Sequence, residues 1–203
     1  MNSKMIAVIV GSGLMLSAVA LRLDDAAPAK ASSGGAKPDA QLIAARVERG
    51  KYIVNTTGCG DCHTPVKLGA NGPEPDLTRM LSGHPESMQL PPAPPASGPW
   101  IASAAATMTA WAGPWGTSFT ANLTPDKETG LGNWTERNFI DTIRSGRKLG
   151  RGRPLLPPMP WPVYRNMTDE DLKAVFAYLQ TVPAVKNKVP DPIVPAPVAV
   201  GQK

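Results

Sequence analysis

The sequence predicts an all-α fold, in which a small helical domain carries a long, ordered insertion rich in proline and glycine. Apolar residues recur at helical spacing in 41–56, and again behind possible N-cap residues at Thr135 and Thr168. The 203 residues allow one compact domain with peripheral segments. Aromatic residues make up only 5% of the chain and there are 23 prolines, so the side chains alone provide a thin core. A further group is therefore expected to fill the interior.

Residues 1–31 have the features of an export segment. Lys4 precedes an apolar run of about 17 residues, and small residues follow. This length lies at the lower limit for a membrane-spanning helix, so the segment is either a cleaved signal peptide or an uncut N-terminal membrane anchor. Residues 32–40 are expected to form a flexible linker. The net charge of +5 comes without any basic run interleaved with aromatics, which argues against nucleic-acid binding.

The predicted domain spans 41–182 and opens with an amphipathic helix over 41–56. Ile43, Val47, Gly50 and Val54 recur at helical spacing along one face of this helix. The glycine on that face is small enough to let a second helix approach closely.

The insertion spans 64–133. Its clustered prolines and frequent glycines exclude a long helix or an inner strand. Free disordered segments rarely carry large apolar side chains, so Trp100, Trp111 and Trp115 predict that its second half packs against the domain as an ordered wrap.

Two further helices follow the insertion. Thr135 is expected to cap a short helix that ends near Gly146, with Trp134 packing over its first turn. Thr168 and Asp171 resemble a capping box at the start of the last helix. Pro183 ends that helix, and 183–203 are expected to form a proline-rich, extended tail.

The chemistry-bearing motif is Cys59-Gly60-Asp61-Cys62-His63, which has the Cys-x-x-Cys-His spacing of c-type haem attachment. Two thiols on one helical turn can each add to a haem vinyl group, and the adjacent histidine then lies beneath the iron. A zinc site normally needs four ligands from two separated pairs, and a thioredoxin-like redox pair needs a βαβ context. Neither alternative fits the residues, so we expect one covalently bound haem c, which also supplies the missing core volume.

His63 is the expected proximal iron ligand, and Met159 is the preferred distal ligand. Met159 lies in Pro157-Pro158-Met159-Pro160, where the prolines stiffen the loop that presents the thioether. His84 is the main alternative. Ligation by histidine and methionine leaves no open position for a substrate, which favours electron transfer over catalysis. The remaining candidates are Met80, Met88, Met108 and Met167.

The order of these features over 41–182 resembles the class I cytochrome c family. The resemblance implies that Gly50 in the first helix meets Tyr178 in the last. It also implies that the carbonyl of Pro75, twelve residues after His63, accepts the ring N–H of that histidine. Leu77, two residues after Pro75, is expected to lie beside the haem as well. Trp134 has two possible roles, as a hydrogen-bond partner of a haem propionate or as an apolar contact of the helix that follows it.

The segment 121–126 and the Pro-Met-Pro-Trp motif further resemble cytochromes of bacterial periplasmic dehydrogenases and respiratory chains. The resemblance implies a periplasmic protein, either soluble or tethered to the inner membrane. It implies redox protein partners, with a dehydrogenase as donor and an oxidase or another cytochrome as acceptor. The leading function is one-electron transfer without catalysis. The alternatives are a fixed cytochrome subunit of a dehydrogenase or respiratory complex, and a haem enzyme or gas-binding protein with an open iron position.

Overall fold

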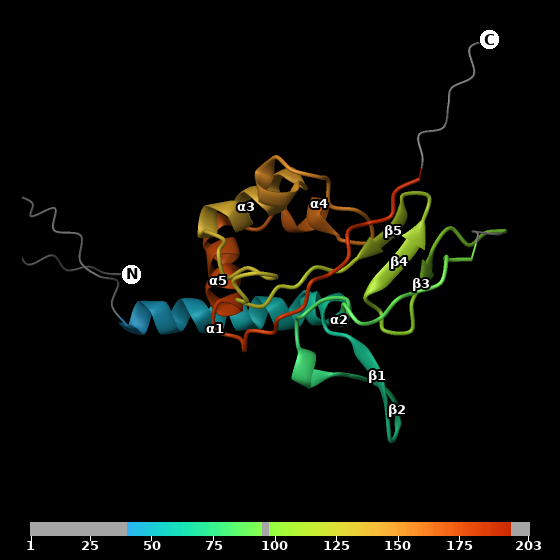
Figure 1. Cartoon of the computed structure of the whole chain (residues 1–203). Coiled ribbons are helices and arrows are strands. Elements are labelled where there is room, and N and C mark those ends of the chain that lie inside the picture. Colours follow the sequence, from blue (N-terminus) through green and yellow to red (C-terminus); the bar gives the residue numbers. More distant parts are fainter. Residues whose placement is uncertain (1–39, 95–97, 196–203) are drawn as a thin grey trace, which may run out of the picture. The chain divides into compact units, whose positions relative to one another are not determined.

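The structure is a computed structural model that describes residues 40–94 and 98–195 (Figure 1). The expected export segment and nearly all of the expected linker lie outside these residues. Among the described residues, no helix combines the length and apolar character needed to cross a membrane. The helices are α1 (Ala40–Thr56), α2 (Cys59–His63), α3 (Glu136–Ser145), α4 (Trp161–Tyr164) and α5 (Asp169–Leu179), with short 3-10 turns η1 (Leu77–Arg79) and η2 (Lys148–Gly150).

Three helices, α1, α3 and α5, form what we call the helical frame. Both α1 and α3 pack against α5 (Figure 1). The crossing of α1 and α5 depends on Gly50, because a Cβ there would lie 1.9 Å from the carbonyl oxygen of Ala174 and 2.9 Å from Cβ of Tyr178. This confirms the close helix approach expected at the glycine. The core of the frame is apolar and consists of Ile53, Val54, Phe139, Ile140, Ile143, Leu172, Val175, Phe176 and Leu179.

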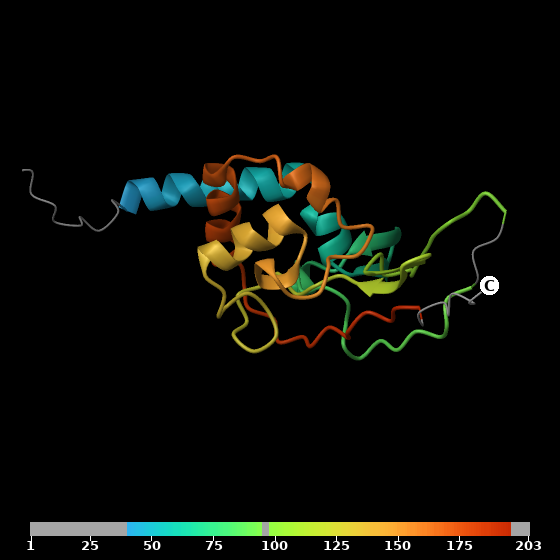
Figure 2. The ribbon, with the colours of Figure 1, turned by 90° about the horizontal axis from the view of Figure 1, so that it is seen from above.

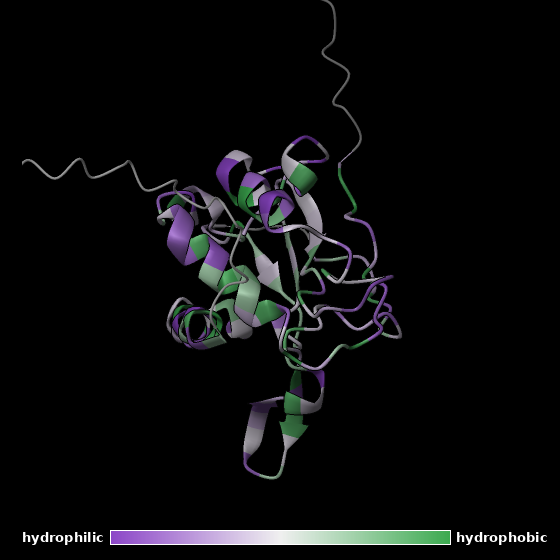
Figure 3. Cartoon of the chain, turned by 90° about the vertical axis from the view of Figure 1, so that its left-hand side faces the viewer, coloured by the Kyte–Doolittle hydropathy of each residue, from purple (hydrophilic) through white to green (hydrophobic). Residues whose placement is uncertain are grey.

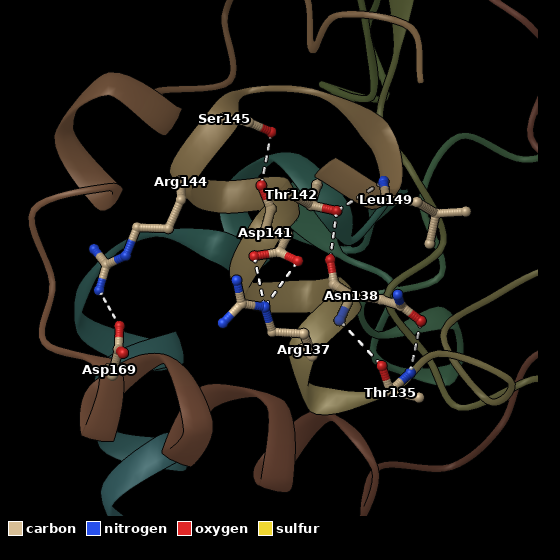
Figure 4. Close-up of polar contacts among 9 residues, drawn as sticks. All are labelled: Thr135, Arg137, Asn138, Asp141, Thr142, Arg144, Ser145, Leu149 and Asp169. Atoms are coloured by element: carbon tan, nitrogen blue, oxygen red, sulfur yellow. Dashed lines mark hydrogen bonds and ion pairs between the residues drawn. The ribbon is translucent and has the colours of Figure 1, made fainter. Parts of the chain in front are cut away.

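Helix α3 begins and ends where the sequence predicts. The Thr135 hydroxyl accepts a hydrogen bond from the Asn138 backbone N–H at 3.1 Å, and the Asn138 side chain accepts from the Thr135 N–H at 3.1 Å (Figure 4). Gly146 ends the helix in a left-handed conformation with φ of 66°. A glycine adopts this conformation without strain, so the turn after α3 has a local cause.

Helix α5 has only half of the expected capping box. The Thr168 hydroxyl accepts from the Asp171 backbone N–H at 3.1 Å. The Asp171 carboxylate instead accepts a hydrogen bond from Nε of Arg49 in α1 at 3.0 Å. The acidic side chain therefore ties the first and last helices together rather than closing the cap.

The prediction of an all-α fold is wrong, because the segment 64–133 contains two small antiparallel sheets. The first is the hairpin β1 (Val66–Gly69) with β2 (Gly72–Pro75), and the second has the order β3 (Ser103–Ala104), β4 (Ala110–Gly113), β5 (Gly116–Phe119). Both hairpins close through two-residue loops flanked by glycines, with Gly69 opposite Gly72 and Gly113 opposite Gly116. Proline excludes inner strands, but a short edge strand tolerates it. The pattern that ruled out long elements therefore did not rule out hairpins.

The β1–β2 hairpin projects from the part of the domain around α2 (Figures 1 and 3). Leu68 at this hairpin is 85% exposed. Trp100 is also 76% exposed, so the expectation that it packs against the domain is wrong, whereas Trp111 and Trp115 are partly buried. Of the three tryptophans, therefore, only Trp111 and Trp115, in and beside the second sheet, pack as predicted.

The described residues after Pro183, 184–195, are extended, and they are attached to the domain along much of their length (Figure 2). The remainder of the expected tail lies outside the described residues. The side chain of Asn187 is fully buried. Its amide donates to the carbonyls of Ser82 at 2.7 Å and His84 at 2.9 Å, and its oxygen accepts from the Glu86 N–H at 2.9 Å and from Arg79 Nη2 at 2.9 Å. We call residues 184–195 the C-terminal strap.

Candidate functional site

The two cysteines of the Cys-x-x-Cys-His motif share the single turn of α2. Gly58, in a left-handed conformation with φ of 74°, separates α2 from α1 and sets its direction. Cys59 and Cys62 are free thiols, both partly buried, and Cys59 packs against the apolar core of the frame. The hydroxyl of Thr57 lies 3.5 Å from Sγ of Cys59. One turn therefore presents two neighbouring thiols next to the domain interior.

Both thiols remain protonated at neutral pH. Burial raises the pKa of Cys59, and Asp61 adds a smaller effect in the same direction. Burial and the nearby Asp61 carboxylate also raise the pKa of Cys62. Reactive redox cysteines and thiolate ligands depend on a lowered pKa, so this environment does not match a thioredoxin-like pair. It matches thiols that are consumed in thioether bonds.

His63 is buried and oriented by a backbone carbonyl. Its Nδ1 donates to the carbonyl oxygen of Ala121 at 2.7 Å. Burial lowers the pKa of His63, which keeps the imidazole neutral. Nε2 forms no hydrogen bond with any described residue. A neutral imidazole with one nitrogen anchored and the other available is the form that binds a metal, so these residues fit a haem iron.

The acceptor of the His63 ring N–H differs from the expected one. The structure assigns this contact to Ala121 and not to Pro75. Pro75 ends the exposed edge strand β2, and Leu77 in η1 is 73% exposed. The proline twelve residues after the histidine is drawn into a hairpin, and a residue 58 positions away in sequence takes its place.

The end of α2 is held by the first part of the insertion. The carbonyl oxygen of His63 accepts from the Gly83 N–H at 2.8 Å. The hydroxyl of Thr64 accepts from the Leu81 N–H at 3.1 Å. These contacts and the Ala121 carbonyl surround the histidine with backbone groups from two separate segments, so its position depends on the insertion.

Met159 is partly buried and packs against the apolar core of the frame. Its segment is attached at both ends. Ser118 in β5 donates to the carbonyl oxygen of Pro157 at 2.6 Å. At the end of α4, the Tyr164 hydroxyl donates to the carbonyl oxygen of Thr57 at 2.6 Å. Thr57 lies two residues before Cys59, so the tyrosine joins the methionine segment directly to the cysteine motif.

His84 is engaged in hydrogen bonds at both ring nitrogens. Nε2 donates to the carbonyl oxygen of Met88 at 3.1 Å, and Nδ1 lies 3.0 Å from the hydroxyl of Thr109. The side chain is fully buried. A histidine bound in this way has no free nitrogen for iron, which favours Met159 over His84 as the expected distal ligand.

The other methionines differ in their surroundings. Met88 and Met108 are 38% and 37% exposed, which does not suit an iron ligand inside a domain. Met80 and Met167 are partly buried against the frame core. Met167 lies next to the Thr168 cap of α5. Burial alone does not separate Met80 from Met159.

Trp134 is partly buried against the frame core, next to the Thr135 cap. This is the apolar surrounding expected for a residue that covers the first turn of α3, and its contact with a propionate stays a prediction.

Three residues of the site, Ala121, Ser118 and Tyr164, could not be identified from the sequence. The contact of each involves a backbone carbonyl, and its two partners lie far apart in sequence. Such contacts leave no signal in residue type or spacing.

Two thiols on one turn, an anchored neutral histidine and a braced methionine segment define the haem-attachment site of a c-type cytochrome. Comparison with known families agrees. The model of the cytochrome c family matches residues 47–183. The chain therefore belongs to the cytochrome c family, whose members bind haem c covalently.

Several curated proteins are similar to the chain. The gluconate 2-dehydrogenase cytochrome c subunit of Pantoea cypripedii is 30% identical over 83% of the chain and 30% of its own length. The fructose dehydrogenase cytochrome subunit of Gluconobacter japonicus is 29% identical over 72% of the chain and 24% of its own length. A nicotinate dehydrogenase subunit of Pseudomonas putida is 39% identical over 38% of the chain and 6% of its own length. The chain thus spans less than a third of each of these relatives.

Proposed function

We propose that the chain transfers single electrons through one haem c that is attached to Cys59 and Cys62, with His63 and Met159 as its axial ligands. When bound, the haem supplies a one-electron iron couple. The observation that carries the proposal is the state of His63, whose Nδ1 is held by the Ala121 carbonyl at 2.7 Å while Nε2 is available. An imidazole prepared in this way needs no reorientation when it binds iron.

The protein residues have three tasks in this function. The hydrogen bond to Ala121 fixes the tautomer of His63 and makes Nε2 a stronger donor toward a metal. The two thiols retain the cofactor covalently. The Met159 segment would offer its thioether to the iron from a fixed position, because its prolines restrict the backbone and its ends are attached to Ser118 and Thr57. With His63 and Met159 both bound, the iron would have no open position for a substrate and would serve electron exchange alone.

The donor proposed for this electron transfer is a dehydrogenase. The relatives from Pantoea and Gluconobacter are named as cytochrome subunits of dehydrogenases. These names favour a chain that accepts electrons from such a partner, either as a fixed subunit or as a carrier that docks briefly. We further propose that this takes place in the periplasm, soluble or tethered to the inner membrane, because residues 1–31 have the composition of an export segment or anchor.

The substitution Met159→Ala tests the axial ligand. Loss of the thioether should abolish the near-infrared sulfur-to-iron band of the oxidised protein and open the iron to carbon monoxide in the reduced protein. Met88→Ala is the matched control, because Met88 is 38% exposed and its side chain should not affect the band. Persistence of the band in Met159→Ala would contradict the assignment and direct attention to Met80. Rapid binding of carbon monoxide to the native protein would support a haem enzyme or gas-binding protein instead.

The partner is tested by purification under mild detergent conditions from the native host. A stable second polypeptide of the dehydrogenase class, at fixed stoichiometry, is expected for a fixed subunit. A single species that exchanges electrons rapidly with several soluble donors would contradict that assignment and support the independent carrier.

A further inference from the structure

The segment that carries Met159 has few hydrogen bonds of its own. Pro157, Pro158 and Pro160 lack a backbone N–H, and the Met159 N–H donates only to Leu156 at 3.3 Å. The segment therefore depends on its carbonyls, which need donors from elsewhere. A stiff backbone limits its internal motion, but it does not fix the position of the segment relative to the rest of the domain.

Ser118 supplies the missing donor. Its hydroxyl donates to the carbonyl oxygen of Pro157 at 2.6 Å, and the serine side chain is buried. The carbonyl of Trp111 is a longer, competing acceptor at 3.3 Å. Since a hydroxyl has one proton to donate, the shorter contact to Pro157 is the stronger of the two. The contact lies two residues from the proposed thioether ligand.

The strand that carries Ser118 is held along both of its edges. On one side β5 pairs with β4, with Ser118 opposite Trp111. On the other side Thr117 exchanges backbone hydrogen bonds with Ile193 of the C-terminal strap at 2.7 and 2.9 Å. Gly116 permits this approach, because a Cβ there would lie 2.0 Å from the carbonyl oxygen of Ile193. A strand paired on both edges is a rigid support for a side chain.

The same stretch of chain also holds the proximal ligand. Ala121, three residues after Ser118, accepts the ring N–H of His63. Between them, Thr120 donates to the carbonyl of Thr109 at 2.9 Å and accepts from the His84 N–H at 3.0 Å. Residues 118–121 are thus bound to other parts of the insertion, with the contact to Pro157 at one end and the contact to His63 at the other.

From these contacts we propose that Ser118 is a positioning residue for Met159, and that residues 118–121 link the placement of both axial ligands. This rests on the assignment of Met159 in the proposed function. Without the serine hydroxyl, the Pro157 carbonyl is left without its donor and the methionine segment leaves the iron more often. An added ligand that competes with the thioether then binds more tightly, while His63 keeps its own anchor.

The test measures the affinity of the oxidised, haem-loaded protein for imidazole, together with the sulfur-to-iron band. Ser118→Ala should bind imidazole about tenfold more tightly than the unmodified protein, as expected for the loss of one buried hydrogen bond. Its sulfur-to-iron band should weaken. The matched control is Ser103→Ala in β3 of the same sheet, since the Ser103 hydroxyl forms no hydrogen bond with a described residue.

A second pair of variants makes the test independent of any loss of stability caused by the substitution itself. Threonine and valine have the same shape, so Ser118→Thr and Ser118→Val place the same volume at this position and differ only in the hydroxyl. The valine variant should bind imidazole about tenfold more tightly than the threonine variant, again by the value of one hydrogen bond. Equal affinities in this pair would overturn the role of Ser118, even if both variants unfold more easily than the unmodified protein.

The outcome for the unmodified protein separates this inference from the assignment on which it rests. A sulfur-to-iron band that is present in the unmodified protein but unchanged in Ser118→Ala contradicts the serine role alone. A band that is missing from the unmodified protein contradicts Met159 as ligand, and the positioning role fails with it.

Discussion

The helical frame and the insertion have interiors of opposite chemical character. Buried residues of the frame are almost all apolar, and Phe139 and Phe176 stack against each other with ring centroids 5.7 Å apart. Buried residues of the insertion and the strap are largely polar. They include Ser82, His84, Thr107, Thr109, Ser118, Asn122, Thr124 and Asn187.

This difference shows two ways of building a rigid site. Apolar packing is non-directional, so the frame needs only side chains of suitable size at helical spacing. The insertion buries few large apolar side chains and instead relies on directional hydrogen bonds between buried polar groups. In the chain from Thr107 to Thr109 to His84, successive polar atoms lie 2.8 and 3.0 Å apart. We therefore expect the frame to supply most of the stability and the insertion to position His63 and the Met159 segment.

The largest expected effect comes from breaking the frame at Gly50. In Gly50→Ala the added Cβ would lie 1.9 Å from the Ala174 carbonyl oxygen, which forces α1 and α5 apart. We expect a loss of about 3 kcal/mol in the free energy of unfolding, or failure to fold. Urea denaturation of the haem-loaded protein measures this. Ala45→Gly, at an exposed position of α1, is the control and should cost about 1 kcal/mol. Similar losses in the two variants would mean that the crossing adapts.

A smaller effect is expected from releasing the strap at Asn187. In Asn187→Ala the Arg79 guanidinium and the Glu86 N–H lose their acceptor, and the carbonyls of Ser82 and His84 lose their donor. We expect a loss of about 3 kcal/mol, concentrated in the insertion. Hydrogen exchange should show faster exchange of the Glu86 amide, while amides of α5 change little.

The neighbouring substitution Lys186→Ala is the control for the strap. The Lys186 side chain is exposed and pairs with Glu128 on the surface, so its removal should have little effect. If the amides of α5 in Asn187→Ala lost as much protection as Glu86, the two regions would unfold as one unit. The distinction between frame and insertion would then not hold.

The smallest expected effect is the contribution of His84 to the pH dependence of the free energy of unfolding, and this effect is absent at neutral pH. Burial lowers the pKa of His84 in the folded protein, below the value of about 6.5 expected in the unfolded chain. On acidification the unfolded chain therefore binds the proton first, and the free energy of unfolding falls as the pH drops below about 6.5. It continues to fall until the folded histidine is protonated.

Comparison with His84→Gln isolates this contribution. The glutamine variant carries no titrating group at this position, so its stability should decrease less steeply over the same pH range. Urea midpoints measured from about pH 7.5 to about pH 4.5, a range that brackets the ordinary histidine pKa, give the two slopes. The other titrating groups are common to both proteins. Parallel curves would show that His84 does not couple the insertion to pH.

The frame and the cysteine motif could be predicted because their signals are local. Gly50 marks a helix crossing, and Thr135 and Gly146 mark the ends of α3 through capping geometry that involves only near neighbours. The spacing of Cys59, Cys62 and His63 follows from the geometry of one helical turn. Each of these predictions needs only residues within about one turn, or one face of a helix.

The insertion could not be predicted to the same degree. Its hairpins use glycines and prolines that equally suit irregular loops, which is why the all-α expectation was wrong. The partner of His63 was misassigned for a related reason. Every non-proline residue has a backbone N–H and every residue a carbonyl, so nothing in residue type distinguishes Ala121 from Pro75 as an acceptor.

By itself, the sequence determined what is local in this protein: the thiol pair with its histidine, the helices α1, α3 and α5 with the caps at Thr135 and Thr168, and the stiffness around Met159. Only the tertiary structure decided which distant backbone groups hold these residues, with Ala121 behind His63 and Ser118 behind Pro157. The physical reason is that hydrophobic periodicity encodes the face of an element, whereas a hydrogen bond between distant segments depends on where the folded chain brings them.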